Sequence, residues 1–218
     1  STWTYGLYVW NGARFIGDFS MDIDLGETQT IDGNQVRGIN QITSHATLVD
    51  ISKCSVVGGT EFANVMQGHT LNIREAKHTA YNRVASLSGI IDIGKFTIDF
   101  KDPSAIPTRA SYLVALSTID RKRIRNVLVN STVATPIAFV FRVVTTGDVD
   151  VSDVKANGTF SIGLADLNTA SNNKWRRCSI SSGTYMFSCT NGGSNLLLDQ
   201  CKPNAAMIAN ASTNPLTF

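Results

Sequence analysis

The chain has 218 residues, of which 43% are hydrophobic and 17% are charged, and its formal net charge is +2. This length and apolar content suit one large domain with its own core, so we expect residues 1–218 to form a single domain. The absence of a lysine-rich run or basic tail argues against strong phosphate-driven binding of nucleic acid. No apolar run reaches the roughly 20 residues that a membrane-spanning helix needs, so we expect no membrane span.

The N-terminal segment carries the clearest pattern in the sequence. Residues 15–25 alternate apolar and polar side chains, which is typical of a β-strand with one buried face and one wet face. Residues 3–10 are also β-prone, and Asn11-Gly12 separates the two runs. Because Asn-Gly tolerates positive φ at both positions, it predicts a two-residue hairpin turn between antiparallel strands.

A short helix is predicted near residues 60–67. Thr60 can cap its first turn, Phe62, Val65 and Met66 would share one face, and Gly68 can end it. We expect this helix to close one end of a sandwich or to cover a sheet edge.

Further strands are predicted towards the C-terminus. In residues 88–100 the apolar positions change parity at Gly94-Lys95, which indicates a β-bulge. Residues 112–119 are apolar on both faces and therefore suit a central strand. Residues 203–218 are polar with small apolar side chains, and we expect them to lie over the surface as a tail.

The predicted fold is an all-β antiparallel sandwich or jelly roll. About ten strands separated by turn signals, one short helix and no βαβ rhythm favour this class. No internal repeat is recognised in the sequence.

The most concentrated charge is the basic segment of Arg121, Lys122, Arg123 and Arg125. It predicts a positive patch for nucleic acid, a sulfated glycan or an acidic neighbour, with a solvated hairpin tip as the alternative. The carboxylates of the 15–25 strand have the opposite sign, so two copies of the chain could dock patch to patch.

Four aromatic residues, Trp3, Tyr5, Tyr8 and Trp10, lie in the first strand and are candidates for contact with a glycan or another subunit. Strand alternation predicts Tyr8 and Trp10 on one face and Trp3 and Tyr5 on the other.

Four cysteines allow two disulfides or four thiols, with Cys178–Cys189 as the candidate bridge among Cys54, Cys178, Cys189 and Cys201. The histidines, His45, His69 and His78, lack the local spacing of a metal pair, and no nucleophile or phosphate-binding motif is present. We therefore expect no metal, no cofactor and no catalytic site.

These observations favour a structural, self-assembling protein, most specifically the coat subunit of a small virus located in the virion. The alternative is an adhesin or pilus subunit, secreted or on the cell surface, that binds a glycan or protein receptor. A β-sandwich hydrolase or lyase that uses the three histidines is the third hypothesis.

Overall fold

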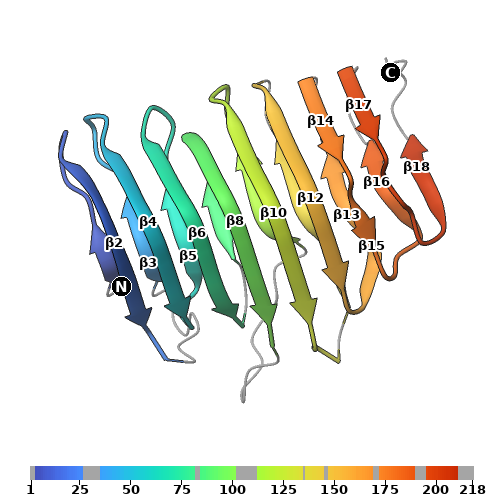
Figure 1. The fold of residues 1–218 in the computed structure, drawn as a ribbon, viewed down its shortest axis with the longest axis horizontal. Helices are drawn as coiled ribbons and strands as arrows, with labels where there is room; N and C mark the ends of the chain where they lie inside the picture. Colours follow the sequence, from blue (N-terminus) through green and yellow to red (C-terminus); the bar gives the residue numbers. More distant parts are fainter. Residues whose placement is uncertain are drawn as a thin grey trace.

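The chain forms a parallel β-solenoid, seen in a computed structural model in Figure 1. The structure describes residues 3–26, 35–81, 84–101, 112–134, 136–144, 147–168, 172–189 and 195–210. Over most of its length the chain alternates between two sheets, so each strand pairs with the strand one coil earlier and one coil later. From the N-terminal to the C-terminal coil the strands progress along the long axis of the molecule (Figure 1).

Within the described residues, each sheet has nine strands. Sheet A contains β1 (Trp3–Tyr8), β3 (Gln35–Gln41), β5 (Glu61–Val65), β7 (Ala85–Leu87), β9 (Tyr112–Ser117), β11 (Ile137–Val144), β13 (Phe160–Leu167), β16 (Tyr185–Cys189) and β18 (Ala206–Asn210). Sheet B contains β2 (Arg14–Asp24), β4 (Leu48–Val57), β6 (Thr70–Ala80), β8 (Ile90–Phe100), β10 (Lys122–Ser131), β12 (Val149–Asn157), β14 (Asn172–Arg176) and β17 (Asn195–Asp199), with β15 (Ser179–Ile180) beside β12.

The predicted antiparallel sandwich or jelly roll is wrong, because all pairings between the described strands are parallel. Asn11 and Gly12 do form a turn, with φ of 24° and 75°, closed by a 2.9 Å hydrogen bond from Ala13 N to Trp10 O. This turn passes the chain from one sheet to the other, and β1 pairs with β3 while β2 pairs with β4. The predicted hairpin is therefore wrong as well.

The predicted helix near residues 60–67 is replaced by strand β5. Thr60 caps no helix: its hydroxyl donates to Val36 O at 2.6 Å and accepts from Val36 N at 3.0 Å, which ties two coils together. Phe62, Ala63 and Val65 are all fully buried. Met66, predicted to share a helical face with Phe62 and Val65, lies beyond the end of β5 and is 47% exposed, so these residues do not form one buried helical face.

The parity change predicted at Gly94-Lys95 is seen in the burial of β8, where Ile91, Ile93, Phe96 and Ile98 are buried. The same spacing recurs along sheet B, so the bend is stacked from coil to coil. From β10 onwards, the bend of each coil contains a residue with positive φ. These residues are Asn126, Asp153, Arg177 and Gln200, with φ of 49°, 58°, 51° and 52°, and the residues directly before them are paired in register from coil to coil.

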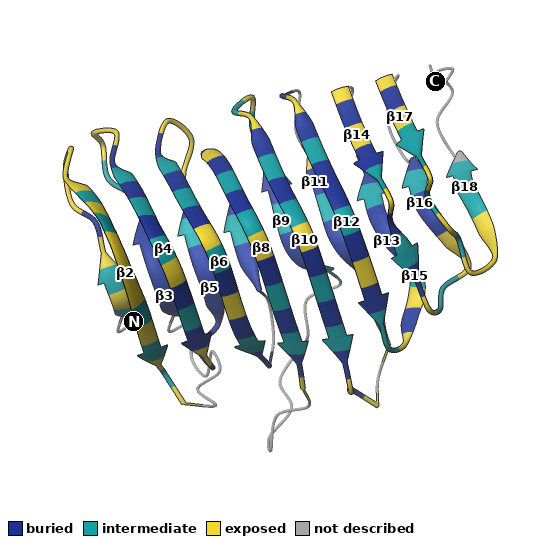
Figure 2. Cartoon of the chain, in the orientation of Figure 1, coloured by how far each residue is buried: buried dark blue, intermediate teal, exposed yellow. Residues whose placement is uncertain are grey.

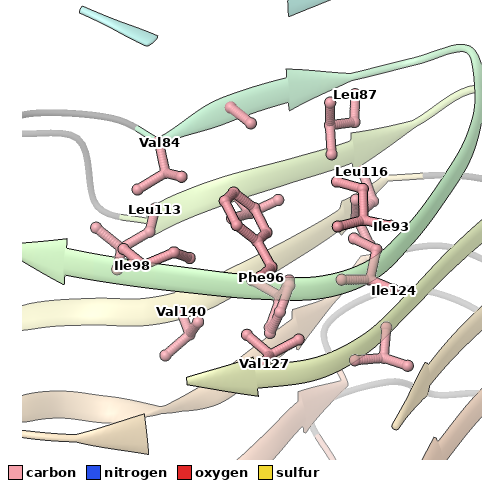
Figure 3. Close-up of a cluster of buried hydrophobic side chains, with 14 of the residues drawn as sticks. Val84, Leu87, Ile93, Phe96, Ile98, Leu113, Leu116, Ile124, Val127 and Val140 are labelled. Atoms are coloured by element: carbon pink, nitrogen blue, oxygen red, sulfur yellow. The ribbon is translucent and has the colours of Figure 1, made fainter. Parts of the chain in front are cut away.

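The core is a continuous apolar layer between the two sheets. Figure 3 shows its centre, where Val84, Leu113 and Val140 from the sheet A side face Phe96 and Val127 from sheet B. Each such side chain, once buried, contributes about 1.5–3 kcal/mol relative to full exposure. Stacking of one coil on the next is therefore the main source of stability, as in other solenoids.

The two ends of the solenoid are less well covered than its centre (Figure 2). At the N-terminal end, every residue of β2 is exposed or only partly buried. At the C-terminal end, residues 206–210, expected to belong to a surface tail, form edge strand β18, and residues 211–218 lie outside the described part. Within the described residues, no helix is long and apolar enough to cross a bilayer.

Candidate interaction surfaces

The basic segment at residues 121–125 begins β10 and does not form one patch. Lys122 points into the core and is fully buried. Its Nζ donates to the carbonyl oxygens of Asp120 at 2.5 Å and Ser88 at 3.3 Å, and lies 3.5 Å from Thr118 Oγ1. Burial lowers the pKa of Lys122 to about 8, because the charged form has lost its water.

The arginines of this segment lie on the outer face of sheet B. Arg125 Nη2 contacts Asp92 Oδ1 at 2.5 Å and Arg123 Nη1 contacts Asp92 Oδ2 at 3.7 Å, so one carboxylate offsets part of their charge. Of the four predicted basic residues, three thus face solvent and two of these share an acidic partner. The remaining net positive charge is smaller than the sequence suggested.

A shallow polar trough runs along this outer face. It consists of a hollow of about 510 Å³ around Arg74, Asp92 and Arg121, a central one of about 230 Å³, and a third of about 510 Å³ next to Asn195 and Leu197. The central hollow shares Arg121 with the first, and shares other lining residues with the third. The three hollows therefore form one elongated surface that follows the solenoid axis.

Hydrogen-bonded ladders line the trough. Asn195 donates to Asn172 at 2.9 Å, and Asn172 donates to Asp148 at 2.9 Å. Arg176 Nη2 donates to both carboxylate oxygens of Asp150, at 2.6 and 2.8 Å. Such pairs hold the polar groups in fixed positions while part of each side chain stays accessible to a ligand.

The predicted aromatic cluster lies at the N-terminal end of the solenoid. The rings of Tyr5 and Tyr8 are stacked at 5.1 Å, and Tyr8 lies 5.5 Å from Trp10, which is 60% exposed. Tyr5 and Tyr8 are therefore on the same side, against the expectation from strict alternation. Trp3 belongs to β1, but its side chain lies outside the described part.

Register pairing aligns one outward-facing residue from each successive strand of sheet B, and we call such a row of paired residues a column. The column that crosses the centre of sheet B is apolar only at its two ends. It begins at Ile16 of β2 and finishes at Leu197 of β17, which are 54% and 47% exposed. The positions between them are polar or charged: Asp50, Asn72, Asp92, Arg123, Asp150 and Lys174. The sequence alone does not single out Ile16 and Leu197, because only the register places them in one column.

The histidines do not come together. His45 is exposed in a loop, whereas His69 and His78 are buried. His69 bonds through Nδ1 to the hydroxyl of Thr47 at 2.8 Å, and His78 Nε2 lies 2.9 Å from Gly58 O. Among the described residues, no group of three or more His, Cys, Asp or Glu side chains is arranged to hold a metal ion.

The four cysteines are free thiols in the structure. Cys189 ends β16 in sheet A, whereas Cys178 follows β14 on the sheet B side. The structure places Cys178 next to Cys201, which was not the pair selected from the sequence.

These features define the chain as a two-sheet parallel β-solenoid with a polar trough on one face, in which the described end strands β2 and β18 are exposed or only partly buried. No family model, curated protein or solved structure matches the chain.

Proposed function

We propose that the chain is a structural subunit that self-associates by stacking the N-terminal end of one solenoid on the C-terminal end of the next. The observation that carries this proposal is the shared column of Ile16 and Leu197, the two exposed apolar ends of an otherwise polar column. In a stack, these side chains would become neighbours and leave water. Both residues lie on edge strands, where exposed apolar side chains favour pairing with another chain.

Strand polarity supports stacking of this head-to-tail kind. β1 and β2 are edge strands at one end and β17 and β18 at the other, and each has one described neighbour in its sheet path. Unpaired edges offer backbone N–H and C=O groups to another chain. Because all described strands are parallel, a second copy in the same orientation would continue both sheets without reversing the hydrogen-bond pattern.

Two further columns have compatible ends. On the inner face of sheet A, Leu7 and Ile208 occupy the ends of one column, and both pack partly against the core. On the outer face of sheet B, Asp22 and Lys202 occupy the ends of another, and both are exposed. A head-to-tail contact between such different ends is heterologous, and it produces open filaments when the rotation between copies does not close a ring.

The self-association predicted from the sequence is thus retained as a proposal, with a different geometry. A jelly-roll coat subunit is not retained, because the chain has parallel sheets wound into a solenoid.

The test substitutes lysine at one end or the other of the solenoid, in the full 218-residue chain. Ile16→Lys removes the apolar N-terminal contact and Leu197→Lys removes the C-terminal one. Light scattering after size exclusion, together with electron microscopy, should show filaments or oligomers for the wild type and monomers for each variant. Ile119→Lys is the matched control, since Ile119 is 64% exposed but lies between β9 and β10, away from both ends.

Mixing the two variants decides the geometry. Each variant keeps one intact end, so an equimolar mixture should form dimers that cannot grow. If contacts were instead head to head, Leu197→Lys would still form dimers alone. A wild type that stays monomeric at high concentration, or filaments in all variants, would overturn the proposal.

A second candidate function is binding of a linear glycan along the polar trough. The trough supports it because its charges largely offset one another and its Asp, Asn and Arg groups can bond to hydroxyls. Arg121→Ala together with Asn172→Ala should abolish retention on a panel of immobilised neutral and sulfated glycans. Failure of the wild type to bind any member of the panel would reject this candidate.

A further inference from the structure

Cys178 and Cys201 lie side by side in consecutive coils. Ser179 forms a parallel bridge with Lys202, and Lys202 N donates to Cys178 O at 2.7 Å. The two cysteines directly precede this pair, so they share its register. Neighbouring parallel strands lie about 4.7–4.9 Å apart, which is within the range of about 4.4–6.8 Å between the Cα atoms of a disulfide.

Both thiols are held near the protein backbone. Cys178 is buried and its Sγ lies 3.4 Å from Arg176 O, while Cys201 is partly buried and its Sγ lies 3.4 Å from Trp175 O. The contact between the two thiols lowers the pKa of Cys201 and, together with burial, raises that of Cys178. Cys201 is therefore both the more accessible of the two and the more readily ionised.

The remaining cysteines have a different environment. Burial raises the pKa of Cys54 to about 12 and that of Cys189 to about 11, so both stay protonated at neutral pH. Because the thiolate is the reactive form, these two residues serve as internal references for reactivity.

We propose that Cys178 and Cys201 are a redox-active pair that forms a disulfide between consecutive coils at the C-terminal end of the solenoid. The oxidant is a low-molecular-weight disulfide such as oxidised glutathione. The Cys201 thiolate attacks one of its sulfur atoms and releases one glutathione thiolate. Cys178 loses its proton and attacks the sulfur of Cys201 in the mixed disulfide, which releases the second glutathione. Two protein thiols are oxidised and one glutathione disulfide is reduced to two thiols.

The bond would fix the last coil to the one before it. β17 is an edge strand with β14 as its neighbour in the sheet, and terminal coils of a solenoid open most readily. A link at Cys178 and Cys201 restricts this opening. The inference does not depend on self-association, because it concerns a bond within one chain.

The experiment measures which thiols react. The full chain, purified under reducing conditions, is incubated with oxidised glutathione, denatured, alkylated and analysed by intact mass and peptide mapping. We expect the loss of two hydrogen atoms, one cross-linked peptide joining Cys178 to Cys201, and alkylation of Cys54 and Cys189. The Cys189→Ser variant should form the same cross-link, and Cys201→Ser should form none.

Three outcomes would overturn the proposal. They are a cross-link between Cys178 and Cys189, glutathione that stays attached to Cys201, and complete alkylation of all four thiols. Far-ultraviolet circular dichroism of Cys201→Ser distinguishes loss of the bond from loss of the fold. Cys201 is only partly buried, and serine keeps its size.

Discussion

Asp22 and Lys202 occupy the two ends of one outward-facing column of sheet B, where they carry opposite charges and are both exposed to solvent. In a head-to-tail stack they would face each other across the new junction. Opposite charges on neighbouring strands stabilise the pair by about 0.2–1 kcal/mol, so Asp22→Lys should weaken self-association about 1.4- to fivefold. Adding Lys202→Asp to the same chain should restore it, as measured by concentration-dependent sedimentation.

The control for this charge reversal is Asp24→Lys. Asp24 is exposed on the same strand, but its register column finishes at Asn157 of β12 and does not reach the C-terminal coil. It should therefore have less effect than Asp22→Lys at low ionic strength. Equal effects of the two reversals, without rescue by Lys202→Asp, would contradict the proposed register.

Buried His78 makes the solenoid sensitive to acid. Burial lowers its pKa to about 4, whereas the unfolded chain titrates near the ordinary value of 6.5. Between these values the unfolded state binds more protons than the folded state, so the free energy of unfolding falls as the pH drops from 6.5 to 4. His78→Gln cannot titrate and can still donate to Gly58 O, so its stability should fall less over this interval. Denaturant titration at several pH values measures the difference.

The control is His45→Gln, because His45 is exposed in a loop. It should keep the wild-type dependence on pH. If His78→Gln lost stability as steeply as the wild type between pH 6.5 and 4, another group would have to cause the acid sensitivity.

Local patterns in the sequence predicted strands, but not their partners. The alternation in residues 15–25 became β2, and the parity change at Gly94-Lys95 became a bend that recurs along sheet B. Asn11-Gly12 specifies a turn, yet the same turn can join two strands of one hairpin or carry the chain between two sheets. Partner choice depends on stacking between whole coils, which no short segment encodes.

The repeat is hard to recognise in the sequence because the loops between strands vary in length. Ile91 pairs with Leu71 on one side and Lys122 on the other, so successive coils have different periods. Lys122 and His78 also occupy inward positions that are otherwise mainly apolar, and so interrupt the pattern further. With the structure known, the recurring buried positions of sheet B and sheet A can be recognised in the sequence.

The candidate surfaces were only partly predictable for the same reason. The aromatic residues of β1 and the exposed arginines of β10 could be identified as surface candidates from composition. The opposed ends Ile16 and Leu197 and the neighbours Cys178 and Cys201 are brought together by the register, which the sequence did not reveal.

Lys122 should give the protein a rise in stability at alkaline pH. Its pKa is about 8 in the folded state and near 10.5 when unfolded, so between these values the folded state holds fewer protons. The free energy of unfolding therefore increases as the pH rises from 8 to 10.5. Lys122→Met should lack this rise, while Lys174→Met, at an exposed position of β14, should keep it. Denaturant titrations at pH 7.5 and 10 compare the slopes, and equal slopes in both variants would contradict the assignment.

The stacked bend carries backbone strain that can be relieved by glycine. Gln200 has φ of 52° and an exposed side chain. It directly follows Asp199 and is the last of the positive-φ residues in this bend, after Asn126, Asp153 and Arg177. This conformation costs a non-glycine residue about 1–2 kcal/mol, partly offset by the greater flexibility of unfolded glycine, about 0.5–1 kcal/mol. Gln200→Gly should therefore raise the free energy of unfolding by about 0.5–1 kcal/mol, given these two costs. Gln200→Val should lower it, because a β-branched side chain fits this region poorly. Thermal and denaturant unfolding should rank Gln200→Gly as the most stable protein, the wild type next and Gln200→Val as the least stable. If Gln200→Val were as stable as Gln200→Gly, the bend in the last coil would not have the left-handed geometry.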